Sequence, residues 1–183
     1  GRSRAAGAST TAWPVFVYFG AIGLGFLFLE IAFIHKLVLF LGHPVYAVGV
    51  ALGGFLVFAG LGSGFAERVL ARARAPGAPE RVACGVLIGL LLVYLAALPP
   101  ALAHALAWPT PVRIALGLAV ISPVAFVMGL FFPAALARVS DAAPELVPWA
   151  WGINGCASVV SAVLATLLAL HFGFSAVVIA ALG

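Results

Sequence analysis

Glu30 is the side chain that is best placed to do chemistry. It is the first acidic residue of the chain, and apolar residues surround it in the sequence. A carboxylate inside an apolar helix is costly in lipid, so it normally faces a bundle interior, a cavity or a partner. It could carry a proton or coordinate a cation, or it could fix helix packing through a hydrogen bond. We favour the packing role, because Ser161 and Thr166 are expected at the same depth in the membrane and could hydrogen-bond to the Glu30 carboxyl.

The nearest charged and titratable neighbours of Glu30 are His35 and Lys36, five and six positions further on. In a straight helix these residues are turned away from Glu30 by roughly 140° and 240°. An ion pair within one regular helix is therefore not expected, and would require the helix to break near Ile34.

Histidines form the second group of candidate ligands. Alternating spans bring four of them, together with Lys36, toward the same outer boundary: His35, His43, His104 and His171. Neutral imidazole binds zinc, copper or haem iron, so a metal or haem site is one alternative. No pair has the tight i, i+4 ligand spacing, so we predict interfacial histidines with no metal or cofactor. His43, in a Leu-Gly-His-Pro turn, is expected to shape the connector.

A polar stripe follows the helix predicted near the C-terminus. Asn154, Ser158 and Ser161 are spaced i, i+4, i+7. Such a stripe could line a substrate path or join two helices, and the second is favoured because serine and asparagine commonly hydrogen-bond across membrane helices.

Small residues predict close helix contacts elsewhere. Gly49 and Gly53 are four positions apart, as are Gly60 and Gly64. Glycines at this spacing let two membrane helices approach closely, so these four residues are predicted packing positions.

The elements that must position these residues are membrane-spanning helices. Hydrophobic residues make up 65% of the chain and charged residues 8%, with a mean hydropathy of +1.25. This composition predicts an all-α, polytopic transmembrane bundle. The expected spans are 13–34, 45–66, 82–106, 112–138 and 148–171, with a truncated sixth from about 175. Residues 1–12 are expected to form a basic leader, and 13–183 the membrane domain of a longer chain.

Arginine distribution predicts orientation and excludes one class of partner. The loop from Glu67 to Arg81 is rich in arginine, and the leader contains Arg2 and Arg4. Both are expected on the cytoplasmic side of a bacterial inner membrane. Short basic loops beside apolar spans do not indicate nucleic-acid binding. The expected partners are the lipid bilayer and either other membrane subunits or the remainder of the same polypeptide.

Three segments carry a resemblance to a known family: FLEIAFIHKLVLFLGHPVYAVGVALGGFLVFAGLGS at 28–63, MGLFFPAALAR at 128–138 and PWAWGINGCASVVSAVLA at 148–165. The chain resembles the C-terminal membrane region of bacterial spermidine synthase-like membrane proteins, which are related to aminopropyltransferases and methyltransferases. The nucleotide-binding glycine motif and the acidic catalytic motif of that family are absent here. The resemblance therefore implies membrane architecture and assigns no catalytic residue.

A looser likeness concerns the order of span, short connector, span and the basic segment GLGSGFAERVLARAR at 60–74. This order is similar to one six-helix half of the major facilitator superfamily. Together the two resemblances imply a non-catalytic membrane domain that acts as anchor, scaffold or subunit of a larger complex. The alternatives are half of a polyamine or small-molecule transporter, and the anchor of an upstream aminopropyltransferase or methyltransferase domain.

Overall fold

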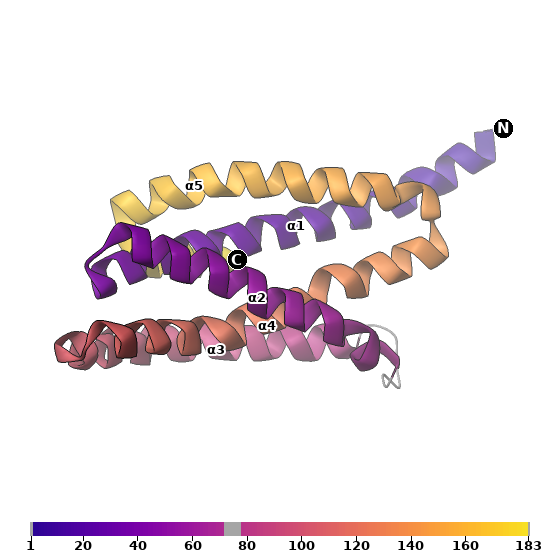
Figure 1. Cartoon of the computed structure of the whole chain (residues 1–183). Coiled ribbons are helices and arrows are strands. Elements are labelled where there is room, and N and C mark those ends of the chain that lie inside the picture. The colour runs from indigo at the N-terminus through magenta and orange to yellow at the C-terminus, as the bar shows by residue number, and fades with distance from the viewer. Residues whose placement is uncertain (1, 72–77, 183) are drawn as a thin grey trace.

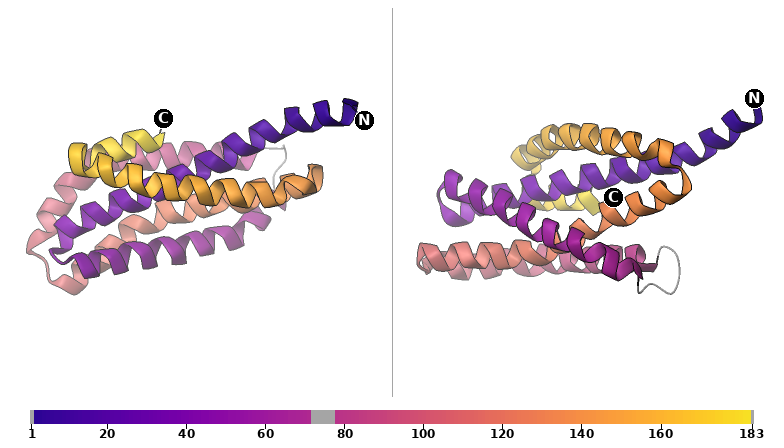
Figure 2. Two further views of the ribbon diagram at one scale, coloured as in Figure 1. Left: turned by 90° about the horizontal axis from the view of Figure 1, so that it is seen from above. Right: turned by 45° about the vertical axis from the view of Figure 1, so that its right-hand side comes forward.

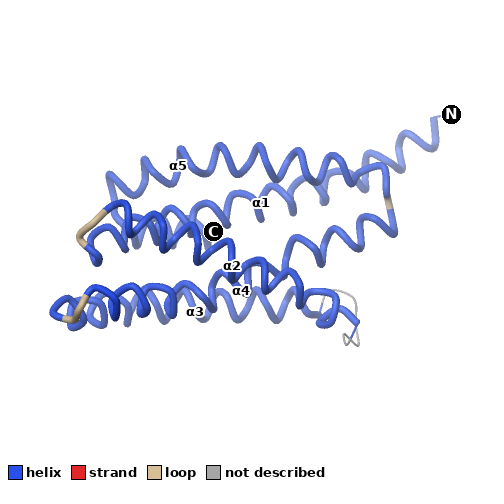
Figure 3. Tube along the Cα trace, viewed as in Figure 1, coloured by secondary structure: helices blue, strands red, loops and turns tan. Residues whose placement is uncertain are grey.

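The computed structural model describes residues 2–71 and 78–182, and every regular element in these ranges is helical (Figures 1 and 3). The elements are α1 (Arg2–Leu41), α2 (Pro44–Ala71), α3 (Ala78–His104), η1 (Ala105–Ala107), α4 (Thr110–Ala142), η2 (Pro144–Leu146) and α5 (Val147–Leu182). Arg72 and Arg74, part of the predicted cytoplasmic loop, lie outside the described residues. The predicted leader is helical from Arg2, as the start of α1.

In residues 2–71 and 78–182, five helices are long and apolar enough to cross a membrane, which confirms the predicted fold class. Their candidate spans are Ala12–Leu41, Pro44–Ala66, Glu80–Ala107, Thr110–Ala142 and Pro144–Phe172. The truncated sixth segment is assigned to α5, whose last turns bend back along the bundle so that the chain ends near its middle (Figures 1 and 2).

The first connector is shorter than the predicted one. α1 continues through His35 and Lys36 to Leu41, and only Gly42 and His43 separate it from α2. The prediction that His35 begins the connector is therefore wrong. Gly42 ends α1 because it adopts a φ of 76°, and its amide donates to the Val38 carbonyl at 3.0 Å. Pro44 suits the first turn of α2 because the missing amide proton would have no partner there.

The helices associate as two crossed pairs. α1 packs most extensively against α5, and α2 against α4, while α3 lies along α4 (Figures 1 and 2). The largest buried side chains include Phe33 of α1, Phe55 of α2 and Ile121 of α4. The core therefore lies where the two pairs meet.

Two glycines set the closest approach of α2 and α4. A Cβ on Gly62 would overlap the carbonyl oxygen of Phe126, and a Cβ on Gly129 would overlap the carbonyl oxygen of Ala59. The obstacles are backbone atoms on the facing helix, which cannot rotate away as a side chain can. The crossing is therefore compatible only with glycine at these two positions.

The predicted packing glycines lie on the other side of α2. Gly49, Gly53, Gly60 and Gly64 meet no atom within 4 Å of the position where a Cβ would stand. None of the four therefore makes a close helix contact within the described part of this chain, and their role as packing positions stays a prediction. The inward-facing positions are Gly62 and Gly54, where a Cβ would lie 3.3 Å from side-chain atoms of both Ile121 and Leu118 of α4.

Proline shapes α4. Pro123 and Pro133 lack the amide proton that would bond the carbonyl four residues earlier. The carbonyl that Pro123 leaves free, on Ala119, accepts a hydrogen bond from the Ser122 hydroxyl at 3.0 Å. α4 begins beside α3 and crosses the bundle to reach the start of α5 (Figure 1). Pro133 lies on this second half, beside a groove between the helix pairs.

Candidate functional site

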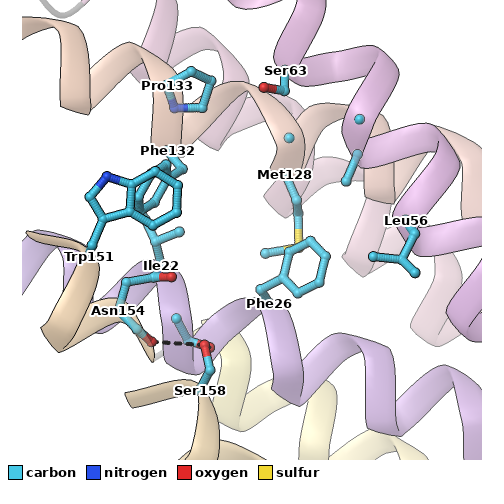
Figure 4. Close-up of a pocket in the computed structure, with 14 residues that line it drawn as sticks. Ile22, Phe26, Leu56, Ser63, Met128, Phe132, Pro133, Trp151, Asn154 and Ser158 are labelled. Atoms are coloured by element: carbon cyan, nitrogen blue, oxygen red, sulfur yellow. Dashed lines mark hydrogen bonds between the residues drawn. The ribbon is translucent and has the colours of Figure 1, made fainter. Parts of the chain in front are cut away.

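A groove of about 490 Å³ opens where the α1–α5 and α2–α4 pairs diverge (Figure 4). All four helices contribute to its wall, including Phe26 of α1, Leu56 of α2, Met128 of α4 and Trp151 of α5. This volume is within the range of small-molecule sites in proteins. The lining carries no charged side chain, so the groove is chemically suited to apolar or neutral polar groups.

One wall of the groove is aromatic. The rings of Phe132 and Trp151 are packed edge to face, with centroids 4.5 Å apart. Phe132 also meets Phe19 edge to face, at 5.2 Å. These ring contacts position Phe132 and Trp151, whose side chains face the groove in Figure 4.

The same side of the groove contains part of the polar stripe, further along α5 from Trp151 (Figure 4). Asn154 Nδ2 donates to the Phe19 carbonyl at 3.2 Å. The Ser158 hydroxyl lies within hydrogen-bonding distance of the Gly23 carbonyl at 3.3 Å and of the Asn154 carbonyl at 2.8 Å. Further along α5, the Ser161 hydroxyl donates to the Leu24 carbonyl at 2.6 Å. The stripe therefore joins α5 to the backbone of α1, while Asn154 and Ser158 also border the groove (Figure 4).

Close approach makes this polar seam possible. A Cβ at Gly23 would overlap the backbone carbonyl oxygen of Asn154. The absence of a side chain at Gly23 therefore brings the serine and asparagine side chains of α5 within reach of α1 carbonyls.

Glu30 is buried, with 6% of its surface exposed. The expected partners do not bind it: Ser161 donates to Leu24, and Thr166 donates to the Ala162 carbonyl of its own helix at 2.7 Å. The predicted hydrogen bond from either residue to Glu30 is therefore wrong. Among the described residues no hydrogen bond or ion pair to the Glu30 carboxyl is found. α1 is unbroken at Ile34, so Glu30 and Lys36 remain on different faces of one helix.

The histidines lie at one end of the bundle but do not converge. His35, His104 and His171 each hydrogen-bond through Nδ1 to the carbonyl four residues earlier, at 2.8–2.9 Å. His43 stacks edge to face on Tyr46, and its carbonyl accepts from the Ala47 amide at the start of α2. Within the described ranges no group of three or more His, Cys, Asp or Glu residues could hold a metal ion.

Sequence reasoning missed a second polar cluster, at the opposite end of the bundle. Glu80, in the first turn of α3, has its Oε1 atom 2.9 Å from Nη2 of Arg138 near the end of α4. The Glu80 side chain is 10% exposed and that of Arg138 43% exposed. The available signal was the position of Glu80, an acidic residue at the end of the predicted arginine-rich loop and at a helix N-terminus, where a negative charge is favoured.

Comparison with protein-family models, with curated proteins and with solved structures finds no significant match. The five apolar helices of the described ranges identify the chain as a multi-pass membrane protein, with a groove between its helix pairs and a half-exposed ion pair at one end.

Proposed function

We propose that the chain is a non-catalytic membrane scaffold that assembles with further transmembrane helices through the outer face of α2. The observation that supports this is the open glycine stripe: a Cβ on Gly49, Gly53, Gly60 or Gly64 would meet no atom within 4 Å beyond its own stretch of helix. On a regular helix these four positions fall within an arc of roughly 60°. Glycine positions on such a face gain no special contact from lipid, whereas they let another helix approach closely.

The groove supports the same proposal because it borders this stripe. Gly60 and Ser63 of α2 are part of its wall, and Leu56 between the two glycine pairs is exposed and also lines it (Figure 4). A helix seated against the stripe would cover this side of the groove. The partner is either another subunit or a further part of the same polypeptide, as expected for the membrane region of a spermidine synthase-like protein.

The experiment replaces stripe glycines by leucine in the full-length protein and follows assembly in native-membrane extracts. Gly53→Leu and Gly60→Leu are expected to dissociate the larger complex while the domain still folds, because a Cβ at either position meets no atom within 4 Å in this chain. Gly85→Leu and Gly89→Leu are matched controls, since both glycines of α3 are equally exposed and equally open. Blue-native electrophoresis and size-exclusion chromatography measure the complex.

A complex that survives the α2 variants would contradict the scaffold proposal for this face. Equal dissociation by the α3 variants would contradict it as well, because the effect would then follow from added bulk at any lipid-facing position.

Half of a small-molecule transporter is the second candidate, and the pairing of the helices favours it. The two most extensive helix contacts are those of α1 with α5 and of α4 with α2. If α4 corresponds to α1 and α5 to α2, as in two repeats of three helices, these two contacts are equivalent. Inverted repeats of three helices produce such a relation in transporter halves. The uncharged lining favours a neutral molecule in this groove over a polyamine.

Glu30→Gln distinguishes the two candidates. The amide keeps the shape of the carboxyl and loses its charge. For a scaffold, we expect the variant to keep the fold and the assembly of the wild type, because no described residue pairs with Glu30. Circular dichroism and native electrophoresis measure these properties. A folded variant that loses proton- or cation-coupled uptake in proteoliposomes would place the transporter first.

A further inference from the structure

Proline leaves one backbone carbonyl in the wall of the groove without its helical donor. Pro133 has no amide proton, so the carbonyl four residues earlier, on Gly129, loses its hydrogen bond within α4. At Pro123 the equivalent carbonyl accepts from the hydroxyl of the preceding residue, Ser122. The residue before Pro133 is Phe132, which has no hydroxyl, and no described side chain donates to the Gly129 carbonyl.

This carbonyl is available to a ligand in the groove. A helical carbonyl points along the axis toward the residue four positions later, and both Gly129 and Pro133 line the groove. An unsatisfied carbonyl is costly at membrane depth, because lipid offers no donor. The α4 wall therefore contains an acceptor that requires a donor from outside the helix.

The α5 wall adds further acceptors. Asn154 uses its amide nitrogen for the Phe19 carbonyl, and its Oδ1 atom receives no hydrogen bond from the described residues. The Ser158 hydroxyl directs its single proton to a backbone carbonyl, so its oxygen can still accept. Ser63 of α2 also lines the groove, and its hydroxyl can accept or donate. Free acceptors thus lie on both helix pairs.

Aromatic and thioether groups lie between these acceptors. Figure 4 shows Phe132 and Trp151 on one side of the opening, and Phe26 and Met128 across it. A flat ring placed between them would contact aromatic rings and a polarisable sulfur, both favourable neighbours. The lining carries no charged side chain, so the ligand that fits is a neutral ring with donors at its edges.

From this arrangement we propose that the groove binds a quinol, a membrane-soluble aromatic ring with two hydroxyl groups. One hydroxyl donates to the Gly129 carbonyl, beside Ser63, and the other donates to Asn154 Oδ1. The apolar tail leaves the groove past Leu56, which is exposed on α2. This role goes beyond the scaffold function and does not depend on whether a further helix covers α2.

The donor requirement selects between the two redox forms of the ligand. A quinol presents two hydroxyl donors, whereas the corresponding quinone presents two carbonyl acceptors. Two acceptors that face each other form no hydrogen bond, so a quinone leaves the Gly129 carbonyl unsatisfied. The groove should therefore prefer the reduced form although both forms have nearly the same shape.

The test measures retention of decylubiquinol and decylubiquinone by the full-length protein in nanodiscs, under anaerobic conditions. Empty nanodiscs correct for partition into lipid. We expect about tenfold stronger retention of the quinol, the effect of one or two hydrogen bonds. Equal retention of the two forms would overturn the proposal. Displacement of the quinol by an equal concentration of dioctanoylglycerol would also overturn it, because a hydroxyl donor without a ring would then suffice.

Pro133→Ala tests the acceptor itself, because alanine restores the amide proton that the Gly129 carbonyl lacks. We expect about fivefold weaker retention of the quinol, the effect of one lost hydrogen bond, and no loss for the quinone. Pro123→Ala is the matched control: it also removes a proline from α4, but the freed carbonyl there already accepts from Ser122, and Pro123 does not line the groove.

Unchanged quinol retention in Pro133→Ala, or an equal loss in Pro123→Ala, would overturn the proposal. Ser63→Ala provides a second variant, at an exposed position where the hydroxyl bonds no described residue, and it should also weaken quinol retention. None of these variants changes a stripe glycine. Assembly tests the scaffold and ligand retention tests the groove, so either proposal can fail without the other.

Discussion

Gly129→Ala is expected to destabilise the membrane domain strongly, although it adds only one methyl group. The new Cβ would overlap the carbonyl oxygen of Ala59, so α2 and α4 would have to separate along the pair that they form. Overpacking typically costs about 1–3 kcal/mol of unfolding free energy, and a backbone obstacle places this variant at the upper end. Reversible unfolding in mixed detergent micelles, followed by circular dichroism, measures the change.

Gly49→Ala is the matched control, because it adds the same methyl group to α2 at a position with no atom within 4 Å. Alanine is favoured over glycine in helices by up to about 1 kcal/mol, so the control should be neutral or more stable. If Gly129→Ala unfolds like this control, the α2–α4 crossing has room for a side chain at that position.

Arg138→Ala has the second largest expected effect. It removes the ion-pair partner of Glu80 and leaves a carboxylate that is nine-tenths buried without a counter-charge. Breaking a buried pair costs about 3–5 kcal/mol. The half-exposed Arg138 side chain lowers our expectation to about 2 kcal/mol, because water can partly replace it. The same unfolding assay measures the loss, with α3 expected to separate from α4.

A double-mutant cycle provides the control for the ion pair. Glu80→Gln combined with Arg138→Ala should be more stable than Arg138→Ala alone, because the uncompensated charge is gone. Additive effects of the two changes would show that the pair contributes no coupling energy.

The sequence predicts the spans well because lipid imposes a length and an apolar composition on every crossing. Each predicted span overlaps one helix, including the fourth with its two internal prolines. Helix ends at the boundary were harder to place. His35 and Lys36 are polar enough to suggest a connector after residue 34, yet the helix ends seven residues later, at Leu41, where Gly42 adopts a positive φ.

Which face of a span points inward could not be read from the sequence. α2 is apolar on all sides, so it has no polar face that would orient it. Gly49 and Gly53 are four residues apart whether they face a neighbouring helix or the lipid, so their spacing does not show which of the two they face. Gly62 differs from them because a Cβ there would overlap a backbone carbonyl of α4. The sequence of α2 alone does not reveal where α4 lies.

Partners of the polar residues were equally hidden. Ser161 was expected to reach the Glu30 side chain and instead donates to a backbone carbonyl of α1. The Glu80–Arg138 pair joins residues 58 positions apart in the sequence, and only the packing of α3 on α4 brings them together.

The seam between α1 and α5 has a consequence for how the two helices recognise each other. Asn154, Ser158 and Ser161 address carbonyl oxygens, which every residue of α1 possesses regardless of its side chain. The polar contacts are therefore one-sided: α5 supplies specific donors, whereas α1 supplies backbone carbonyls and a missing Cβ at Gly23. The side chains of α1 contribute through apolar packing instead, as in the contact of Phe16 with Trp149. A substitution on α1 that keeps Gly23 and this packing should therefore leave the polar contacts unchanged.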